Sequence, residues 1–155
     1  MQYIEAVSSV EQRNQLSLFL AGGITNCPDW QADVMADPRL HHKLPVTIYN
    51  PRRADFPIGD PAAALEQIAW EHDKLKQADA ISFWFPCETI CPIVLFELGA
   101  HLQGNKKLVV GIHPDYQRRQ DVEIQTGLAR PYQDVIVGFD AFMNSLIDKI
   151  QDMLS

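Results

Sequence analysis

A chain of 155 residues has the usual size of one domain, and 46% hydrophobic with 21% charged residues is typical of a folded core. The formal net charge of -7 disfavours a surface for nucleic acids or for anionic membranes. Residues 1–15 lack the pattern of a signal peptide, and no apolar run approaches the roughly 18 residues of a membrane helix, so we expect a cytoplasmic protein with a small-molecule ligand.

Short apolar runs alternate along the chain with longer segments of helical periodicity, which is the pattern of βαβ units. The runs predict five strands, at residues 16–21, 46–50, 80–85, 107–112 and 134–137. Helix starts are indicated between them by prolines that closely follow capping residues, in the pairs Asn26 and Pro28, Asp60 and Pro61, and Thr89 and Pro92. We predict an α/β fold with a single domain over residues 1–155, a doubly wound five-stranded parallel sheet of flavodoxin-like or Rossmann-like type.

Two helices are predicted at about residues 61–78 and 140–153. In the first, one stripe at helical spacing is predicted to face the core, which makes His72 a packed imidazole; it consists of Leu65, Ile68, Ala69 and His72. Glu71 and Asp73 lie off this stripe, so each is either an ordinary surface charge or an acid that reaches a ligand site.

Polar residues and glycines follow the predicted strands at the point where each ends. The carboxyl ends of parallel strands meet at one edge of the sheet, where ligands bind in such folds. The candidate binding residues there are Gly22, Gly23, Asn26, Asn50, Arg52, Arg53 and Thr89. The glycine pair predicts a tight turn that lets the backbone approach a ligand, although it lacks the dinucleotide and P-loop motifs. The arginine pair is either solvated or grips a phosphate or carboxylate.

Glu97 is the only Asp, Glu, Lys or Arg between Glu88 and Lys106, and its helical neighbours include Ile93 and Val94. A carboxylate in apolar company is paired, protonated or used in chemistry, whereas the ordinary alternative is a narrow solvent-facing strip. With Glu71 or Asp73 in the same cleft, Glu97 would suit glycosidic chemistry, which uses two carboxyl groups.

The three cysteines, Cys27, Cys87 and Cys91, are an odd number without the spacing of a disulfide framework or a zinc site. We therefore expect three reduced thiols and no metal.

Several motifs resemble, in order over about residues 16–114, the nucleoside 2-deoxyribosyltransferase-like family. They are residues 19–24 (FLAGGI), 50–53 (NPRR), 70–71 (WE), 83–86 (FWFP), 91–93 (CPI) and 96–99 (FELG). The resemblance implies a flavodoxin-like fold, a homo-oligomer whose active sites are completed by a neighbouring subunit, and no metal or organic cofactor. It also implies that the substrates are a nucleoside or nucleotide and a free base.

The resemblance assigns roles to individual residues. Glu97 corresponds to the family's nucleophile, which attacks C1' of a 2'-deoxynucleoside and forms a deoxyribosyl ester that a second base then displaces with net retention. Glu71, or failing it Asp73, corresponds to the acid that handles the proton of the departing and arriving base. Phe19 and Cys91 stand where other members have a tyrosine and an aspartate.

Two alternatives remain open at this stage. If water reaches the ester, the protein is a nucleoside or nucleoside-monophosphate N-glycosidase, and Arg52 and Arg53 would clamp a 5'-phosphate. Alternatively, the same scaffold is a non-catalytic nucleotide-binding or sensing module in which Glu97 bonds a sugar hydroxyl.

Overall fold

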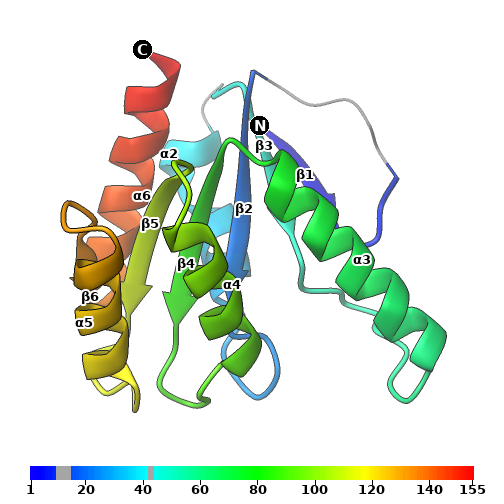
Figure 1. Ribbon diagram of the computed structural model, residues 1–155. Coiled ribbons are helices and arrows are strands. Elements are labelled where there is room, and N and C mark those ends of the chain that lie inside the picture. The colour runs from blue at the N-terminus through cyan, green and yellow to red at the C-terminus, as the bar shows by residue number, and fades with distance from the viewer. Residues whose placement is uncertain (10–14, 42–43) are drawn as a thin grey trace.

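The structure is a computed structural model that describes residues 1–9, 15–41 and 44–155. The described residues form one parallel sheet of six strands in the order β1-β3-β2-β4-β5-β6, with helices on both faces (Figure 1). The strands are β1 (Gln2–Glu5), β2 (Leu16–Gly22), β3 (Val46–Asn50), β4 (Ala80–Phe85), β5 (Lys107–Ile112) and β6 (Val135–Val137). The helices are α1 (Trp30–Ala36), α2 (Pro38–His41), α3 (Pro61–Gln77), α4 (Pro92–Leu102), α5 (Arg119–Ala129) and α6 (Phe139–Leu154).

The helices divide into two layers that enclose the sheet. Helices α3, α4 and α5 cover one face, and α1, α2 and α6 cover the other (Figure 1). Each layer has its own hydrophobic cluster, one including Trp70 and Leu98 and the other including Trp30 and Phe142. Because both faces are covered, β2, β3 and β4 are buried along their whole length, which is why they read as continuous apolar runs in the sequence. No helix in the described part of the chain is long and apolar enough to cross a membrane.

The predicted α/β fold is confirmed, but the predicted count of five strands is wrong. The four longer predicted strands occur as expected, β2 being one residue longer, and β6 begins at Val135 rather than one residue earlier. The strand that the sequence did not indicate is β1, which pairs with β3 at the edge of the sheet. Only Ile4 of its four residues is buried, because this strand lies at the edge of the sheet. Its sequence therefore contains no apolar run that would have predicted a strand.

The helix predictions are confirmed for α3 and α6 to within one residue at each end. The predicted starts near Pro28 and Thr89 need correction: α1 is capped by Asp29, whose carboxylate accepts from the Ala32 amide, and α4 is preceded by Cys91 at the cap position. Helix α2 begins at Pro38 directly after Asp37, a pair of the same kind that the sequence analysis did not single out, whereas α5 follows Arg118, which makes no side-chain cap hydrogen bond. Neither helix was predicted.

The predicted core stripe of α3 is wrong. Leu65 and Ile68 are 71% and 63% exposed, and His72 is exposed rather than packed. The buried side chains of α3 are instead Ala63, Trp70 and Leu75. One end of α3 extends beyond the sheet in Figure 1, so a stripe that would otherwise face a core remains on the surface.

We predict that Gly22→Ala destabilises the protein. A Cβ atom at Gly22 would lie 2.6 Å from the Trp84 carbonyl oxygen and would overlap the Trp30 ring, so the substitution should lower the free energy of unfolding by on the order of 2 kcal/mol. Chemical denaturation measures the change. Gly99→Ala is the control, because nothing lies within 4 Å of the added methyl group and alanine favours a helix. Equal midpoints for the two variants would contradict the prediction.

Candidate active site

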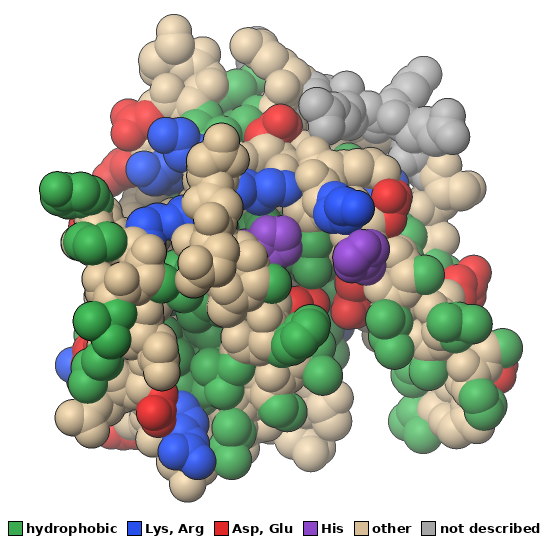
Figure 2. Space-filling model, viewed as in Figure 1, with side chains coloured by type: hydrophobic (Ala, Val, Ile, Leu, Met, Phe, Trp, Pro, Cys, Tyr) green, Lys and Arg blue, Asp and Glu red, His purple; other side chains and the backbone are tan. Residues whose placement is uncertain are grey.

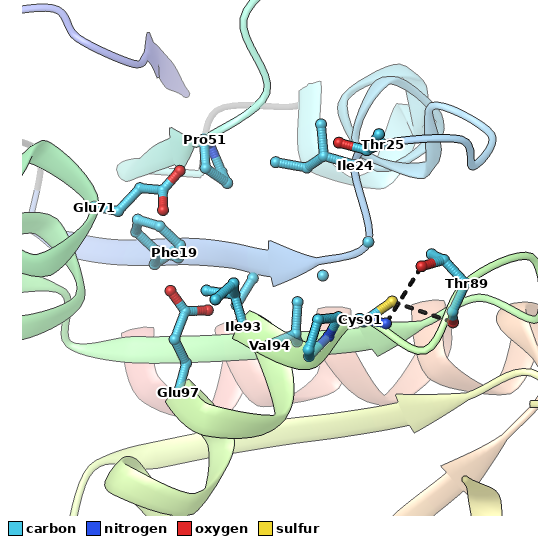
Figure 3. Close-up of a pocket in the computed structure, with 14 residues that line it drawn as sticks. Phe19, Ile24, Thr25, Pro51, Glu71, Thr89, Cys91, Ile93, Val94 and Glu97 are labelled. Carbon is cyan, nitrogen blue, oxygen red and sulfur yellow. Dashed lines mark hydrogen bonds between the residues drawn. The ribbon is translucent and has the colours of Figure 1, made fainter. Parts of the chain in front are cut away.

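A cavity of about 400 Å³ lies at the carboxyl end of β2, between the loop that follows this strand and helices α3 and α4 (Figure 3). This is the point where the strand order reverses, since β3 and β4 lie on opposite sides of β2. Most of its lining is apolar and comes from β2, its following loop and the start of α4. The lining residues are Phe19, Ala21, Gly22, Gly23, Ile24, Thr25, Pro51, Glu71, Thr89, Cys91, Pro92, Ile93, Val94 and Glu97.

Two carboxylates enter this cavity from different helices. Glu71 extends from the middle of α3 and Glu97 from the second turn of α4, and the two side chains point toward each other beside the Phe19 ring (Figure 3). No Lys, Arg or His occurs among the described residues that line the cavity. The arrangement therefore places two acids together in apolar surroundings without a nearby cation.

Burial shifts the acid–base behaviour of this pair. The pKa of Glu97 is raised to about 8, first by burial and second by the negative charge of Glu71. Burial also raises the pKa of Glu71, but a hydrogen bond from Gln67 opposes that rise. Two interacting carboxyl groups lose their protons in separate steps, so the pair retains one proton near neutral pH. Such a pair contains an anionic group and a proton donor at the same time.

The turn before α4 determines where this helix starts and therefore where Glu97 lies. Cys91 has a positive φ of 53°, its amide donates to Thr89 Oγ1 at 3.4 Å, and its carbonyl accepts from the Leu95 amide at 3.0 Å (Figure 3). Burial raises the pKa of the Cys91 thiol to about 12, so this sulfur is a neutral part of the wall. All three cysteines are free thiols, as predicted.

The glycine pair lines the cavity as predicted, and packing within the protein also requires it. Gly23 donates its amide to the Trp84 carbonyl, and its own carbonyl accepts from the Trp30 indole at 3.0 Å. A Cβ atom at Gly23 would lie 2.7 Å from Pro86 and 2.8 Å from the Cys27 sulfur. The backbone is thus held close to both aromatic and sulfur-containing side chains below the cavity.

Arg52 is predicted to bind a ligand, but the structure uses its guanidinium within the protein. Nε donates to Gln31 Oε1 at 3.0 Å, Nη2 donates to the Pro28 carbonyl at 2.9 Å, and Asp29 lies 3.3 Å away. The buried Asn50 side chain accepts from the Arg52 amide and donates to the Tyr3 hydroxyl. These residues brace the loops beside the cavity and do not line it.

Three other predicted residues also lie outside the lining. Arg53 is mostly buried, with Asp55 at 3.7 Å and the Phe56 ring at 5.7 Å. Asn26 is exposed in the loop after β2, with a positive φ of 58°. Asp73 accepts from Gln77 and lies 3.6 Å from Lys74. The structure thus brings together five of the predicted residues, namely Gly22, Gly23, Glu71, Thr89 and Glu97.

The apolar part of the lining was not predicted as a site. Ile24, Ile93 and Val94 read as ordinary core residues, because apolar type alone does not distinguish a cavity wall from a packed interior. The usable signal was their position, since Ile24 directly follows Gly23 and since Ile93 and Val94 lie in the first turn of the helix that follows β4.

We predict that Glu97→Gln stabilises the protein increasingly as the pH rises. The unfolded Glu97 carboxyl ionises near its ordinary pKa of 4.5 but the folded one near 8, so wild-type stability declines between these values. Glutamine does not ionise and removes this decline, so at pH 8 the free energy of unfolding of the variant should exceed that of the wild type by about 2 kcal/mol or more. Thermal denaturation at pH 5 and pH 8 measures it, with the exposed Glu66→Gln as the control. A stability difference that does not change with pH would contradict the prediction.

Comparison with known proteins identifies the family of the chain. A search of curated proteins finds no match to the chain. A family model described as "Nucleoside 2-deoxyribosyltransferase like" matches residues 15–116. The matched segment runs from the start of β2 to the turn after β5, so it contains every residue that lines the cavity. The chain therefore belongs to the nucleoside 2-deoxyribosyltransferase-like family.

Proposed function

We propose that this protein is a nucleoside 2-deoxyribosyltransferase that exchanges the base of a 2'-deoxynucleoside through a covalent ester on Glu97. The observation that carries the proposal is the pair of carboxyl groups of Glu71 and Glu97, which point toward each other in an apolar cavity. A double displacement needs one carboxylate as nucleophile and one carboxyl group as proton donor. The raised pKa of Glu97 places the single proton of the pair mainly on Glu97 near neutral pH, so the reaction proceeds from the minor form in which this proton has moved to Glu71 and Glu97 is ionised.

In the first half of the reaction, an ionised Glu97 oxygen attacks C1' and the bond from C1' to the base nitrogen breaks. Glu71 donates its proton to the departing base, which leaves neutral. In the second half, the nitrogen of an arriving base attacks C1', the ester bond breaks, and the arriving base returns a proton to Glu71. Two inversions at C1' give net retention.

The apolar lining supports this chemistry. Phe19 and Cys91 offer no charge or strong hydrogen bond to the carboxyl pair, and both line the cavity. Burial among such groups raises the pKa of Glu97, and a carboxyl pair with little access to water favours transfer to a base over hydrolysis of the ester.

The charges around the cavity favour a nucleoside over a nucleoside monophosphate as substrate. The cavity lining contains two acids, and the Arg52 guanidinium is committed to Gln31 and Pro28. A 5'-phosphate would therefore lie near negative charge without a cation from the described lining to balance it.

We also propose that a second copy of the chain covers the mouth of the cavity and completes the site. Large apolar side chains are exposed on the face formed by α3, α4 and α5 (Figure 2), the most exposed being Phe96 (77%), Leu128 (76%), Leu65 (71%), Ile93 (64%) and Ile68 (63%). Exposed apolar surface of this kind is typical of an interface. Phe96 is next to Glu97 in sequence, and Ile93 itself lines the cavity, so a partner on this face would lie over the carboxyl pair.

Base exchange tests the reaction. The wild-type protein, given a 2'-deoxynucleoside and a different free base, should form the new deoxynucleoside, and Glu97→Gln should lower the rate at least a thousandfold because it lacks the nucleophile. Chromatography of the nucleosides measures the product, and Glu66→Gln is the control that retains activity. Base release without exchange would instead identify a hydrolase, and binding without turnover would identify a sensing module. The matching 5'-monophosphate should react more slowly than the nucleoside.

Size-exclusion chromatography with light scattering tests the assembly. Phe96→Glu places a charge in the proposed interface, so it should convert an oligomer into a monomer and reduce base exchange with it. Tyr132→Glu is the control, since Tyr132 is 99% exposed on the turn between α5 and β6. A wild-type protein that is already monomeric would contradict the proposal.

A further inference from the structure

Gln67 is a polar residue beside the carboxyl pair that does not itself line the cavity. It lies one helical turn before Glu71 on α3, and its Nε2 donates to two acceptors, Glu71 Oε1 at 2.6 Å and the Pro51 carbonyl at 2.7 Å. Pro51 directly follows β3 and lines the cavity. The amide thus ties a carboxylate on α3 to the backbone at the carboxyl edge of the sheet.

We propose that Gln67 is a positioning residue that fixes the direction of the Glu71 carboxyl group and directs its exchangeable proton to Oε2. This role rests on the proposed base exchange, in which Glu71 donates and accepts that proton.

The hydrogen-bond chemistry of an amide supports the assignment. An amide NH₂ group has two hydrogens and cannot accept, and here both hydrogens have an acceptor partner. Glu71 Oε1 therefore already accepts a hydrogen bond, and a proton on that oxygen would meet the amide hydrogen. Oε2 is the oxygen that carries the proton when Glu71 is the acid. Since Glu71 lines the cavity, this assignment leaves one defined oxygen for the substrate.

The surroundings of Glu71 leave Gln67 as the group that opposes the effect of burial. Across the cavity, α4 presents the acid Glu97, whereas β2 and the turn after β3 present the uncharged Phe19 and Pro51. On α3 itself, His72 is exposed and Lys74 lies near Asp73 and over the Tyr49 ring. The hydrogen bond from Gln67 lowers the pKa of Glu71 against the rise caused by burial.

The same helix contains a matched pair for comparison. Gln77 donates to Asp73 with the same spacing of four residues, but this amide and carboxylate are exposed and lie outside the cavity. Gln77→Met is therefore the control for Gln67→Met, since each variant removes one amide from a similar pair on α3.

Carboxyl titration by NMR of protein with ¹³C-labelled glutamate tests the positioning directly and does not depend on activity. In Gln67→Met the pKa of Glu71 should rise, because its anion loses a donor, and the pKa of Glu97 should fall, because Glu71 is less often charged. Gln67→Glu should raise the pKa of Glu71 further and provides a second variant if methionine prevents folding. An unchanged Glu71 titration in the folded variants would overturn the proposal.

Steady-state kinetics with a deoxynucleoside and a free base provides the second measurement. Gln67→Met should lower kcat about tenfold or more while KM changes less than twofold, because the substrate does not touch the amide. The positioning role would be overturned if Gln67→Met kept the wild-type kcat although the pKa of Glu71 had shifted. It would also be overturned if the control Gln77→Met lost as much kcat as Gln67→Met. If the wild-type protein neither exchanges nor releases a base, the proposed function fails, and the titration still decides whether Gln67 controls the Glu71 carboxyl group.

Discussion

The placement of two partly buried carboxyl groups in one apolar cavity is the constraint on which the site depends. Neither Glu71 nor Glu97 has a cation among the described residues that line the cavity, so the pair lowers its charge by holding a proton. This solution differs from an ion pair, because it preserves a proton that can move. Three features affect whether that proton lies on Glu71 or on Glu97: the apolar wall, the position of α4 and the hydrogen bond from Gln67.

The polar residues around the cavity belong to two classes with different roles. Arg52, Asn50 and Trp30 donate to carbonyl or amide oxygens and to a hydroxyl within the protein, and they hold the loop after β2 against β3. The carboxyl groups have few partners and remain available to a ligand. Loops held by several hydrogen bonds around two partly buried acids are the arrangement expected of a preorganised site.

The sequence predicted the sheet well where burial was complete. Strands β3, β4 and β5 have the predicted bounds because their apolar runs leave no other placement. The prediction failed where the environment is mixed: β1 has one buried residue in four, and the apolar stripe of α3 faces outward. Periodicity identifies an apolar face, but it does not state whether the protein's own core or another molecule covers it.

For the cavity, the isolation of Glu97 among apolar residues and the rule of the sheet's carboxyl edge pointed to four residues that line it, namely Glu97, Gly22, Gly23 and Thr89. The same rule gave no means to separate Arg52 and Asn50, which brace loops, from residues that line the cavity, because both kinds occur at the same edge. That distinction depends on where each side chain points, and the amino-acid sequence alone does not give this direction.

The Trp30 indole has a further consequence for study of the protein. Its nitrogen donates to the Gly23 carbonyl and its ring packs against Gly22, and both glycines line the cavity, whereas the ring also packs edge-on against Phe142 in the hydrophobic cluster that the two residues share. Trp70 similarly contacts Phe19 from the α3 side. Two of the three tryptophans thus contact residues that line the cavity, so a ligand that entered it would change the surroundings of both indoles and could be followed by intrinsic fluorescence without an added label.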